Sequence, residues 1–430
     1  MSLTILLLLF LFLVMIRMPV GFAMAAASIA TILIFPEMRV PMVIVPQRML
    51  ASVDSFVLLA VPLFIAAGFI MEASGIAGKL LDLARVMVGH LRGGLGQIVV
   101  VSEMFFSGIS GSTIADVSAI STMVLPSMKK AGYQKGQSVA IISAASAMGI
   151  LIPPCINMVV MGGMVSISVA ALFFAGFLPA FVLAALLMIL LAFQAKSLNI
   201  QPLPRATAIE FWTAVRKAII PLGMPLIIFG GILGGVMTPT ESAAVAVLYS
   251  LVAGFAVYRT LTWKRVFDIA ILTGTLTGAV LLMVQMASSF AYLMAIEDLP
   301  ALIAQGILQV SNAPWFFLIV TALIFILIGS LLEGLPAMII FIPILLPVAV
   351  TVGVDQLHWG IIVIASLGIG MFVPPTGVGL IIACSVADCS IEAASKALVP
   401  LMLALLTGLG VLIFFPEITL VVPRLLKMWG

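Results

Sequence analysis

Two stretches of the chain place small polar residues and a proline pair inside otherwise apolar sequence. The first contains Ser107–Thr113 (SGISGST) and Gly149–Asn157 (GILIPPCIN), and its pattern returns between Leu327 and Val378. Two adjacent prolines remove two backbone donors and force the preceding residue out of helical geometry, so a helix must break there. Inside a membrane, a broken helix is tolerated only where it is buried in protein or lines a cavity. The pattern therefore predicts a site for a solute and ions in a transporter.

The predicted ion sites rest on oxygen chemistry. Unwound backbone offers carbonyl oxygens and Ser or Thr adds hydroxyls, which suit a hard cation such as sodium. Each serine could instead be a small residue that permits close helix packing. The candidate ligands are Ser107, Ser110, Ser146, Gly149 and Pro153 for a first ion, and Gly329, Gly370, Pro374 and Thr376 for a second.

A carboxylate substrate is predicted from the ends of the half-helices. The helices that start after each polar tip and each proline pair would point the positive ends of their dipoles into the cavity, where they would attract an anion. The identity of the anion is not readable from the sequence. The candidate substrate-binding residues are Ser112, Thr113, Asp116, Asn157, Glu333, Thr376 and Gly377.

Four acidic residues lie in or near apolar stretches, namely Glu103, Asp116, Glu241 and Glu333. Carboxylates inside a membrane are functional candidates by default. Asp116 could equally complement the dipole of the helix after the first tip, and Glu333 could cap or gate the second tip. Glu241 follows Pro239 and is expected to be a first-turn helix acid, whereas Glu103 could face either the rest of the protein or water.

The composition identifies lipid as the solvent. Of 430 residues, 64% are hydrophobic and only 8% are charged, too few to cover a soluble surface. A net charge of +3 gives no indication of nucleic-acid binding, and no phosphate-binding glycine-rich loop is present. The cysteines Cys155, Cys384 and Cys389 show neither metal-ligand spacing nor a disulfide framework. Leu3–Ile16 lacks a basic region and a cleavage site and is interpreted as a retained first span rather than a signal peptide.

The apolar runs predict an all-α polytopic membrane protein. A polar loop is expected between the second and third spans, and an interfacial amphipathic helix at Ile76–Leu91. A re-entrant hairpin at 94–128 and a broken span at 137–167 follow. The linker Gln194–Lys217 ends in another candidate interfacial helix, Ala206–Lys217. The remaining expected spans are Leu3–Ile16, Val20–Phe35, Phe56–Met71 and Ala170–Phe193.

An internal duplication explains the second copy. Pro153 and Pro374 are 221 residues apart (374 − 153), and the same spacing separates Gly149 from Gly370. Glycine and proline mark particular backbone geometry, so a common spacing indicates two copies of one unit. We divide the chain into a first repeat, 1–210, and a second repeat, 211–430, with a hairpin at 313–348 and a broken span at 357–387. Gly108 and Gly329, Pro126 and Pro347, Gly132 and Gly353, and Pro179 and Pro400 share the spacing.

Each repeat is predicted to contain five crossing segments plus the hairpin. An odd number of crossings inverts the second copy relative to the first, the inverted-repeat arrangement of secondary transporters. With the N-terminus outside, only Arg39, Arg48, Arg424 and Lys427 of the 19 Lys and Arg fall on the outer side, as the positive-inside rule requires. The hairpin halves could instead be two short tilted spans, but their polar Gly/Ser tip favours re-entrance.

The chain resembles the large membrane subunit of tripartite ATP-independent periplasmic (TRAP) transporters, the DctM family. The resemblance covers essentially the whole chain. Cys155 is a departure from the pattern, because a serine is expected after the proline pair. The residues that carry the resemblance are Ser107–Asp116, Val124–Met128 before Gly132-Tyr133, Gly149–Pro154, Leu172–Gly176 with Pro179, and Phe372–Leu380.

The resemblance implies an elevator-type transporter coupled to sodium, which is the transported ion, with no organic cofactor. It implies a bacterial inner membrane location with both termini periplasmic. The expected partners are a small four-helix membrane subunit (DctQ-like), a periplasmic solute-binding protein (DctP-like), the lipid bilayer and a carboxylate substrate. In the family, each hairpin tip meets the neighbouring broken helix at a sodium site.

Other functions fit the sequence less well. An enzyme would need a nucleophile–base or metal constellation, but the histidines, His90 and His358, lie in no such motif. A channel would not need two broken helices with matching polar tips, and a purely structural subunit would leave the ion-site features without a role. The main alternative is a stand-alone carboxylate or oxyanion transporter of related inverted-repeat fold.

Overall fold

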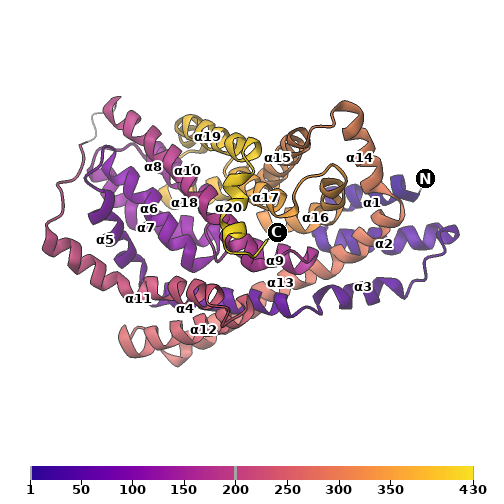
Figure 1. Cartoon of the computed structure of the whole chain (residues 1–430), viewed down its shortest axis with the longest axis horizontal. Coiled ribbons are helices and arrows are strands. Elements are labelled where there is room, and N and C mark those ends of the chain that lie inside the picture. The colour runs from indigo at the N-terminus through magenta and orange to yellow at the C-terminus, as the bar shows by residue number, and fades with distance from the viewer. Residues whose placement is uncertain (1, 198–200, 430) are drawn as a thin grey trace.

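The computed structural model describes residues 2–197 and 201–429, and the described residues form helices and no strands (Figure 1). An all-α fold is confirmed. The first half contains α1 (Ser2–Met15), α2 (Val20–Ile34), α3 (Ile44–Val53), α4 (Ala60–Ala73), α5 (Ala77–Val88), α6 (Gly94–Ser110), α7 (Thr113–Lys130), α8 (Lys135–Gly149), α9 (Ile156–Val165) and α10 (Val169–Ser197). The second half contains α11 (Ala208–Leu233), α12 (Pro239–Val252), α13 (Trp263–Ile296), α14 (Leu299–Val310), α15 (Pro314–Leu331), α16 (Gly334–Thr351), α17 (Gln356–Gly370), α18 (Val378–Ala387), α19 (Ile391–Phe414) and α20 (Glu417–Leu425).

The described chain is that of a membrane protein. Eight helical segments are long and apolar enough to cross a bilayer. Large apolar side chains are exposed along several of them, including Phe181, Leu226 and Leu323. Because exposed apolar side chains are stable in hydrocarbon rather than in water, these faces are expected to lie in lipid.

The helix bounds repeat with the spacing found in the sequence. α7 and α8 begin at residues 113 and 135, and α16 and α17 begin at 334 and 356, each 221 residues later. α6 and α15 end at residues 110 and 331, again 221 apart. Both hairpins and both broken spans therefore lie where the sequence predicts them. The inversion of the second repeat across the membrane, and the division into 1–210 and 211–430, stay predictions.

Two local expectations differ from the structure. Residues 44–53, expected as loop, form helix α3, which packs along α13. The Ser288 hydroxyl donates to the Arg48 carbonyl at 3.0 Å, and the Arg48 guanidinium lies 4.2 Å from the Tyr292 ring centre. The expected interfacial helix Ala206–Lys217 is instead the first part of α11, which continues to Leu233. The repeat boundary after residue 210 thus falls in the first turn of α11, and residues 198–200 of the linker lie outside the described residues.

The hairpins and broken helices of the two halves pack directly on each other. α8 contacts α17, α18 and α19. The glycines at these contacts leave no room for a side chain. If Gly368 of α17 carried a Cβ atom, that atom would overlap the Ala147 carbonyl, and a Cβ atom on Gly136 of α8 would lie 2.7 Å from the Ala393 carbonyl. Small residues let these backbones touch, as is usual where helices associate in lipid. In Figure 1, α13 and α3 run along the lower side of the molecule, below α9 and α16 in this view.

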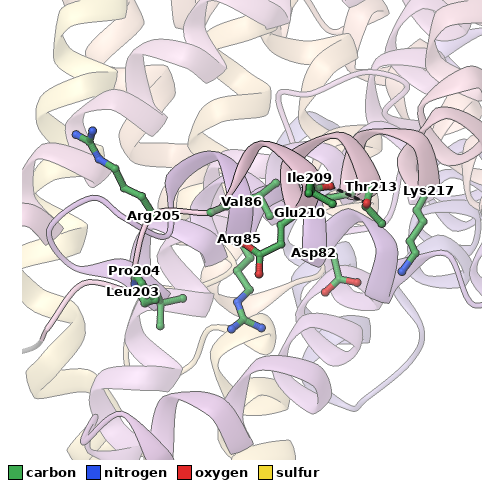
Figure 2. A pocket seen from close by; sticks show the side chains of 12 residues that line it. Asp82, Arg85, Val86, Leu203, Pro204, Arg205, Ile209, Glu210, Thr213 and Lys217 are labelled. Carbon is green, nitrogen blue, oxygen red and sulfur yellow. Dashed lines mark hydrogen bonds between the residues drawn. The ribbon is translucent and has the colours of Figure 1, made fainter.

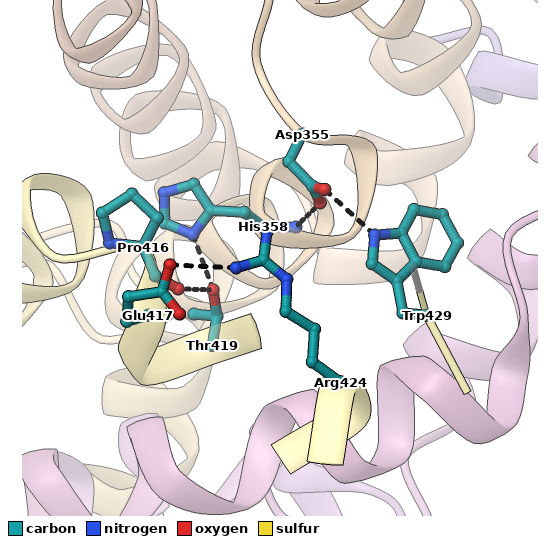
Figure 3. A network of polar contacts seen from close by, with 7 residues as sticks. All are labelled: Asp355, His358, Pro416, Glu417, Thr419, Arg424 and Trp429. Atoms are coloured by element: carbon teal, nitrogen blue, oxygen red, sulfur yellow. Dashed lines mark hydrogen bonds and ion pairs between the residues drawn. The ribbon is translucent and has the colours of Figure 1, made fainter. Parts of the chain in front are cut away.

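A polar network ties the C-terminal segment to the start of α17 (Figure 3). Asp355 caps α17 by accepting from the N–H groups of Leu357 (2.9 Å) and His358 (3.0 Å). Its second oxygen accepts from Trp429 Nε1 at 3.0 Å. The Thr419 hydroxyl donates to the Pro416 carbonyl, so it accepts from His358 Nδ1 at 2.8 Å. The network fixes the first half of the second broken span.

Candidate functional site

The first hairpin turns through Gly111 and Ser112. Gly111 ends α6 with φ 65°, a left-handed conformation that favours glycine. Ser112 is extended and precedes the first turn of α7, and its N–H donates to Ser110 Oγ at 3.1 Å. A Cβ added at Gly111 would lie 2.9 Å from the Pro154 carbonyl oxygen. The tip therefore rests directly on the proline break between α8 and α9.

One face of α6 carries the polar groups of the first site. Glu103, Ser107 and Ser110 are spaced i, i+4, i+7, which places them on one side of a helix. The Ser107 hydroxyl donates to Asp116 Oδ2 at 2.8 Å, and the Ser110 hydroxyl donates to Asp116 Oδ1. Asp116 is only 1% exposed. It joins α6 to α7 and forms the centre of a buried polar cluster.

α8 brings Ser146 and Gly149 to this cluster. A Cβ added at Gly149 would overlap Ser107 Oγ and lie 3.2 Å from Glu103 Cγ. Glu103 and Ser146 are each 0% exposed. Glu103 lies beside Ser146, but among the described residues neither Glu103 carboxyl oxygen nor Ser146 Oγ makes a hydrogen bond of full geometry. The Pro153 carbonyl oxygen lies 3.5 Å from a Cβ added at Gly108.

The donor set of this cluster fits a hard cation. Its groups are carboxyl, hydroxyl and carbonyl oxygens, with no thiolate or imidazole among the residues named. A buried carboxyl group without a partner is costly in apolar surroundings, and a cation bound between Glu103, Ser146 and Asp116 would relieve that cost. The structure thus brings Ser107, Ser110 and Gly149 together, with Ser146 one turn earlier on α8, whereas the Pro153 carbonyl lies beside Gly108 on another face of α6. The structure adds Glu103 and Asp116 to the cluster.

The second candidate site is built differently. A Cβ added at Gly370 would lie 2.6 Å from the Ile326 carbonyl and 3.1 Å from Gly329 Cα. A Cβ added at Gly329 would lie 3.2 Å from the Leu367 carbonyl. Gly329 and Gly370 therefore meet, and backbone oxygens lie beside them. Pro374 is half-buried and Thr376 is exposed.

The two candidate ion sites are not chemically equivalent. At the 221-residue spacing, the first-repeat residues Glu103, Ser107, Asp116 and Ser146 correspond to Ile324, Ile328, Ala337 and Leu367. The second copy thus retains the glycines and the break but replaces these polar side chains with apolar ones. Backbone carbonyls must supply most of any cation coordination there.

A cavity of about 50 Å³ lies between the two hairpin tips and the first proline break. Asn157 and Gly334 come from opposite halves, and a Cβ added at Gly334 would lie 3.4 Å from Asn157 Nδ2. The first residues of α7, α9 and α16 all line the cavity, so three helix N-termini converge on it. Its lining comprises Gly111, Ser112, Thr113, Ile114, Ile150, Cys155, Ile156, Asn157, Glu333, Gly334, Leu335 and Met371.

The candidate substrate residues divide into two groups. Ser112, Thr113, Asn157 and Glu333 line the cavity. Asp116 lies in the buried cluster with Ser107 and Ser110 instead. Thr376 and Gly377 are not among the cavity-lining residues, and Gly377 packs on the backbone of Met371.

One protein family matches almost the whole chain, including both hairpin tips. The family described as "Tripartite ATP-independent periplasmic transporter, DctM component" matches residues 7–418. The chain belongs to the DctM family. It is a large permease of the TRAP transporter class, and its relatives are transporter permeases rather than enzymes. The description as tripartite and periplasmic implies a small permease and a periplasmic binding protein as further components.

Several DctM relatives are similar over most of this chain. The chain is 34% identical over 413 residues to the sialic acid TRAP transporter large permease protein SiaM of Vibrio cholerae, covering 96% of both chains. It is 33% identical over 381 residues to the C4-dicarboxylate TRAP transporter large permease protein DctM of Pseudomonas aeruginosa, covering 89% of both. It is 37% identical over 401 residues to the isethionate TRAP transporter permease protein DctMQ of Oleidesulfovibrio alaskensis, of which it covers 63%.

A solved structure shares the fold. The YdaH transporter of Alcanivorax borkumensis superposes with a TM-score of 0.62 over 86% of this chain and 87% of that chain. The sequence identity is 17%, so the likeness concerns architecture alone.

The structure of this DctM protein also shows site residues that were not among the predicted ligands. Glu103 was singled out as an intramembrane acid, and its i, i+4 spacing to Ser107 was the available signal. Gly68 of α4 gave no signal: a Cβ there would lie 2.7 Å from the Ser110 carbonyl. Ile150 and Met371 line the cavity from the ends of α8 and α17. Glu241, expected as a first-turn acid, forms a capping box with Thr238 at the start of α12.

Proposed function

We propose that this DctM protein takes up an organic acid, a carboxylate, together with sodium ions and by an elevator mechanism. The observation that carries the proposal is the position of the cavity. It lies between the two hairpin tips, and its residues Gly111 and Ser112 immediately follow Ser110 of the buried oxygen cluster. A solute in the cavity and a cation in the cluster would therefore share one hairpin turn.

Three helix N-termini favour an anion in the cavity. Each helix end carries about half a positive elementary charge and unpaired backbone N–H groups. α7, α9 and α16 begin at Thr113, Ile156 and Gly334, which all line the cavity. The names of the relatives include sialic acid, C4-dicarboxylate and 2,3-diketo-L-gulonate, which are carboxylates, and isethionate, which is a sulfonate. These names support an organic anion, and among organic anions we propose a carboxylate.

The acids around the cavity support coupling to sodium. Glu333, at the second hairpin tip, lines the cavity. Asp116 and Glu103 lie about one and two helical turns from the first hairpin tip. When ionised, these acids oppose the entry of a carboxylate, and bound cations would remove that opposition. Substrate affinity should then rise with sodium concentration, and sodium affinity should rise with substrate by the same factor.

An elevator mechanism requires the hairpins and broken helices to move as one body. Direct backbone contacts of α8 with α17 and α19 support such a body, because they leave no side-chain layer that could slide. We place the protein in a bacterial inner membrane with both termini periplasmic, in complex with a four-helix DctQ-like subunit. A DctP-like binding protein would deliver the substrate.

Flux into proteoliposomes tests the proposal. The complete transporter should lose uptake when choline replaces sodium at fixed pH and clamped potential. Uptake should rise more steeply than linearly with sodium if both sites are used. Undiminished transport in choline, or dependence on a proton gradient alone, would remove sodium from the mechanism. Full uptake by this chain without its partners would instead support a stand-alone carboxylate or oxyanion transporter of related fold.

A further inference from the structure

A polar cavity of about 350 Å³ lies far from the hairpin tips, between α5 and the beginning of α11 (Figure 2). Its lining includes three cations, Arg85, Arg205 and Lys217, and two acids, Asp82 and Glu210. Arg205 and Lys217 mark its two ends in Figure 2, and Arg85 lies between them. The cavity belongs to neither candidate ion site, and nothing in the proposed transport cycle uses it.

The three cations of this cavity outnumber its two acids. The ion pairs of the described chain are Lys135–Asp388, Lys396–Glu392 and Arg424–Glu417, and none of them involves a cavity residue. Glu210 is engaged in the capping box of α11, where it accepts from Thr207 N at 2.8 Å and Thr207 Oγ1 at 2.9 Å. Glu210 keeps its negative charge in this capping box and interacts with Arg85, so the cavity lining offers two acids for three cations.

Lys79, on the same helix as Asp82 and Arg85, adds to this excess. α5 lies outside the candidate membrane spans. Burial lowers the pKa of the Lys79 ammonium, and the positive charge of Lys217 lowers it further. Its charge faces the ring of Tyr258, 3.1 Å away, rather than a carboxylate. An anion bound beside Lys217 would relieve this repulsion.

The cavity walls are held in place by the fold. The Leu203 N–H donates to the Gly89 carbonyl at 2.9 Å, and the Leu203 side chain packs on a small core that contains Ala84 and Ile98. This anchors the 201–207 linker against the corner between α5 and α6. The backbone is thus fixed two residues before Arg205, whose side chain is exposed.

The same end of α11 faces lipid. Ile209, which lines the cavity, is 80% exposed, and Trp212 is 67% exposed. Ile219 and Leu226 continue an exposed apolar stripe along α11. Exposed Trp next to cationic side chains is typical of the membrane–water interface. Acyl chains could therefore lie along the stripe while a headgroup occupies the cavity.

We propose that this cavity, at the junction of α5, the 201–207 linker and α11, binds the phosphate-bearing headgroup of an anionic phospholipid. Arg85, Arg205 and Lys217 contact the phosphate and headgroup oxygens, and the lipid bridges α5 to the start of the second repeat. Arginine forms the forked hydrogen bonds that suit phosphate, and Lys supplies a mobile charge. Basic pockets between helices at the membrane surface commonly bind anionic headgroups.

Lipid binding to the purified full chain in detergent tests this assignment. Phosphatidylglycerol should bind, detected by native mass spectrometry and by a higher unfolding temperature, whereas phosphatidylcholine should not. Each basic residue near a lipid surface contributes about fivefold in affinity, so Arg85→Gln/Lys217→Gln should weaken binding roughly 25-fold. The matched control, Lys129→Gln/Lys130→Gln, removes two exposed cations from the end of α7 and should leave binding unchanged.

Two further measurements decide among the alternatives. Asp82→Asn removes one of the two acids and should tighten phosphatidylglycerol binding about fivefold, a gain that misfolding cannot produce. Inorganic phosphate at millimolar concentration should not displace the lipid. Equal binding of phosphatidylcholine, an unchanged Arg85→Gln/Lys217→Gln variant, an unchanged Asp82→Asn variant, or displacement by inorganic phosphate would each overturn the proposal.

Discussion

The contact between Gly149 and Ser107 yields a double-mutant cycle whose sign can be worked out from the structure. In Gly149→Ala the new Cβ overlaps Ser107 Oγ. Ser107 must turn away, and its 2.8 Å hydrogen bond to Asp116 is lost. Leaving a buried carboxyl oxygen without its donor costs about 1–3 kcal/mol. Ser107→Ala alone loses the same hydrogen bond and should cost a similar amount.

The two changes together should cost no more than either alone. Without Ser107 Oγ, the nearest atoms to the new Cβ are Glu103 Cγ at 3.2 Å and Ser107 Cβ at 3.4 Å, which small adjustments can accommodate. The hydrogen bond is lost once rather than twice, so the coupling energy should be about 1–3 kcal/mol in the direction of rescue. The extra methyl group also favours helix by about 0.5–1 kcal/mol relative to glycine.

The cycle is measured in two ways. Thermal unfolding of the purified chain reports stability, and sodium titration of uptake by the reconstituted transporter reports the half-saturating sodium concentration. Each single variant should raise that concentration about 5- to 150-fold, which corresponds to a loss of about 1–3 kcal/mol in sodium binding. Gly230→Ala is the matched control, because a Cβ there meets nothing within 4 Å. Additivity of the two changes within about 0.5 kcal/mol would refute the reasoning.

Three further predictions concern packing, capping and topology. Gly370→Ala should lower the apparent unfolding temperature more than Gly149→Ala does, because its Cβ would lie 2.6 Å from the Ile326 carbonyl and 3.1 Å from Gly329 Cα, where only backbone could yield; the opposite order in thermal scans would contradict this. Asp355→Ala should destabilise the protein by about 1–2 kcal/mol through loss of the α17 cap. Trp429→Phe keeps this cap but loses the 3.0 Å bond to Asp355, so it should cost less. Equal shifts of the unfolding temperature would show that the cap is unimportant. In a variant without the native cysteines, Gln47→Cys should react with an impermeant maleimide added to intact spheroplasts and Gln134→Cys should not, both positions being exposed; reversed labelling would overturn the sidedness.

The two candidate ion sites differ in their polar side chains, and the sequence already contains this difference. The 221-residue spacing relates Asp116 to Ala337 and Ser107 to Ile328. The duplication alone predicts two equivalent ion sites, but the residues at this spacing share the backbone shape and not the charged cluster. The equivalence of the two sites has to be limited to their glycines and proline breaks.

The sequence by itself determined the membrane class, the duplication and the positions of the helix breaks. These follow from local causes: apolar runs require lipid, and a proline pair removes backbone donors whatever surrounds it. Both hairpins and both broken spans accordingly lie where they were predicted. Helix α3 was missed because its sequence, IVPQRMLASV, mixes proline, polar and apolar residues, and its packing against α13 stabilises it.

The tertiary structure alone decided which polar groups meet. Glu103 could have faced water, but the close approach of Gly149 on α8 buries it against Ser107. Asn157 and Gly334 come from different repeats, and their meeting across the cavity depends on how α9 packs against α16. Spacing along a chain fixes neighbours on one helix, whereas contacts between helices depend on the shapes of whole faces. The cavity between the tips could therefore be seen only in the folded protein.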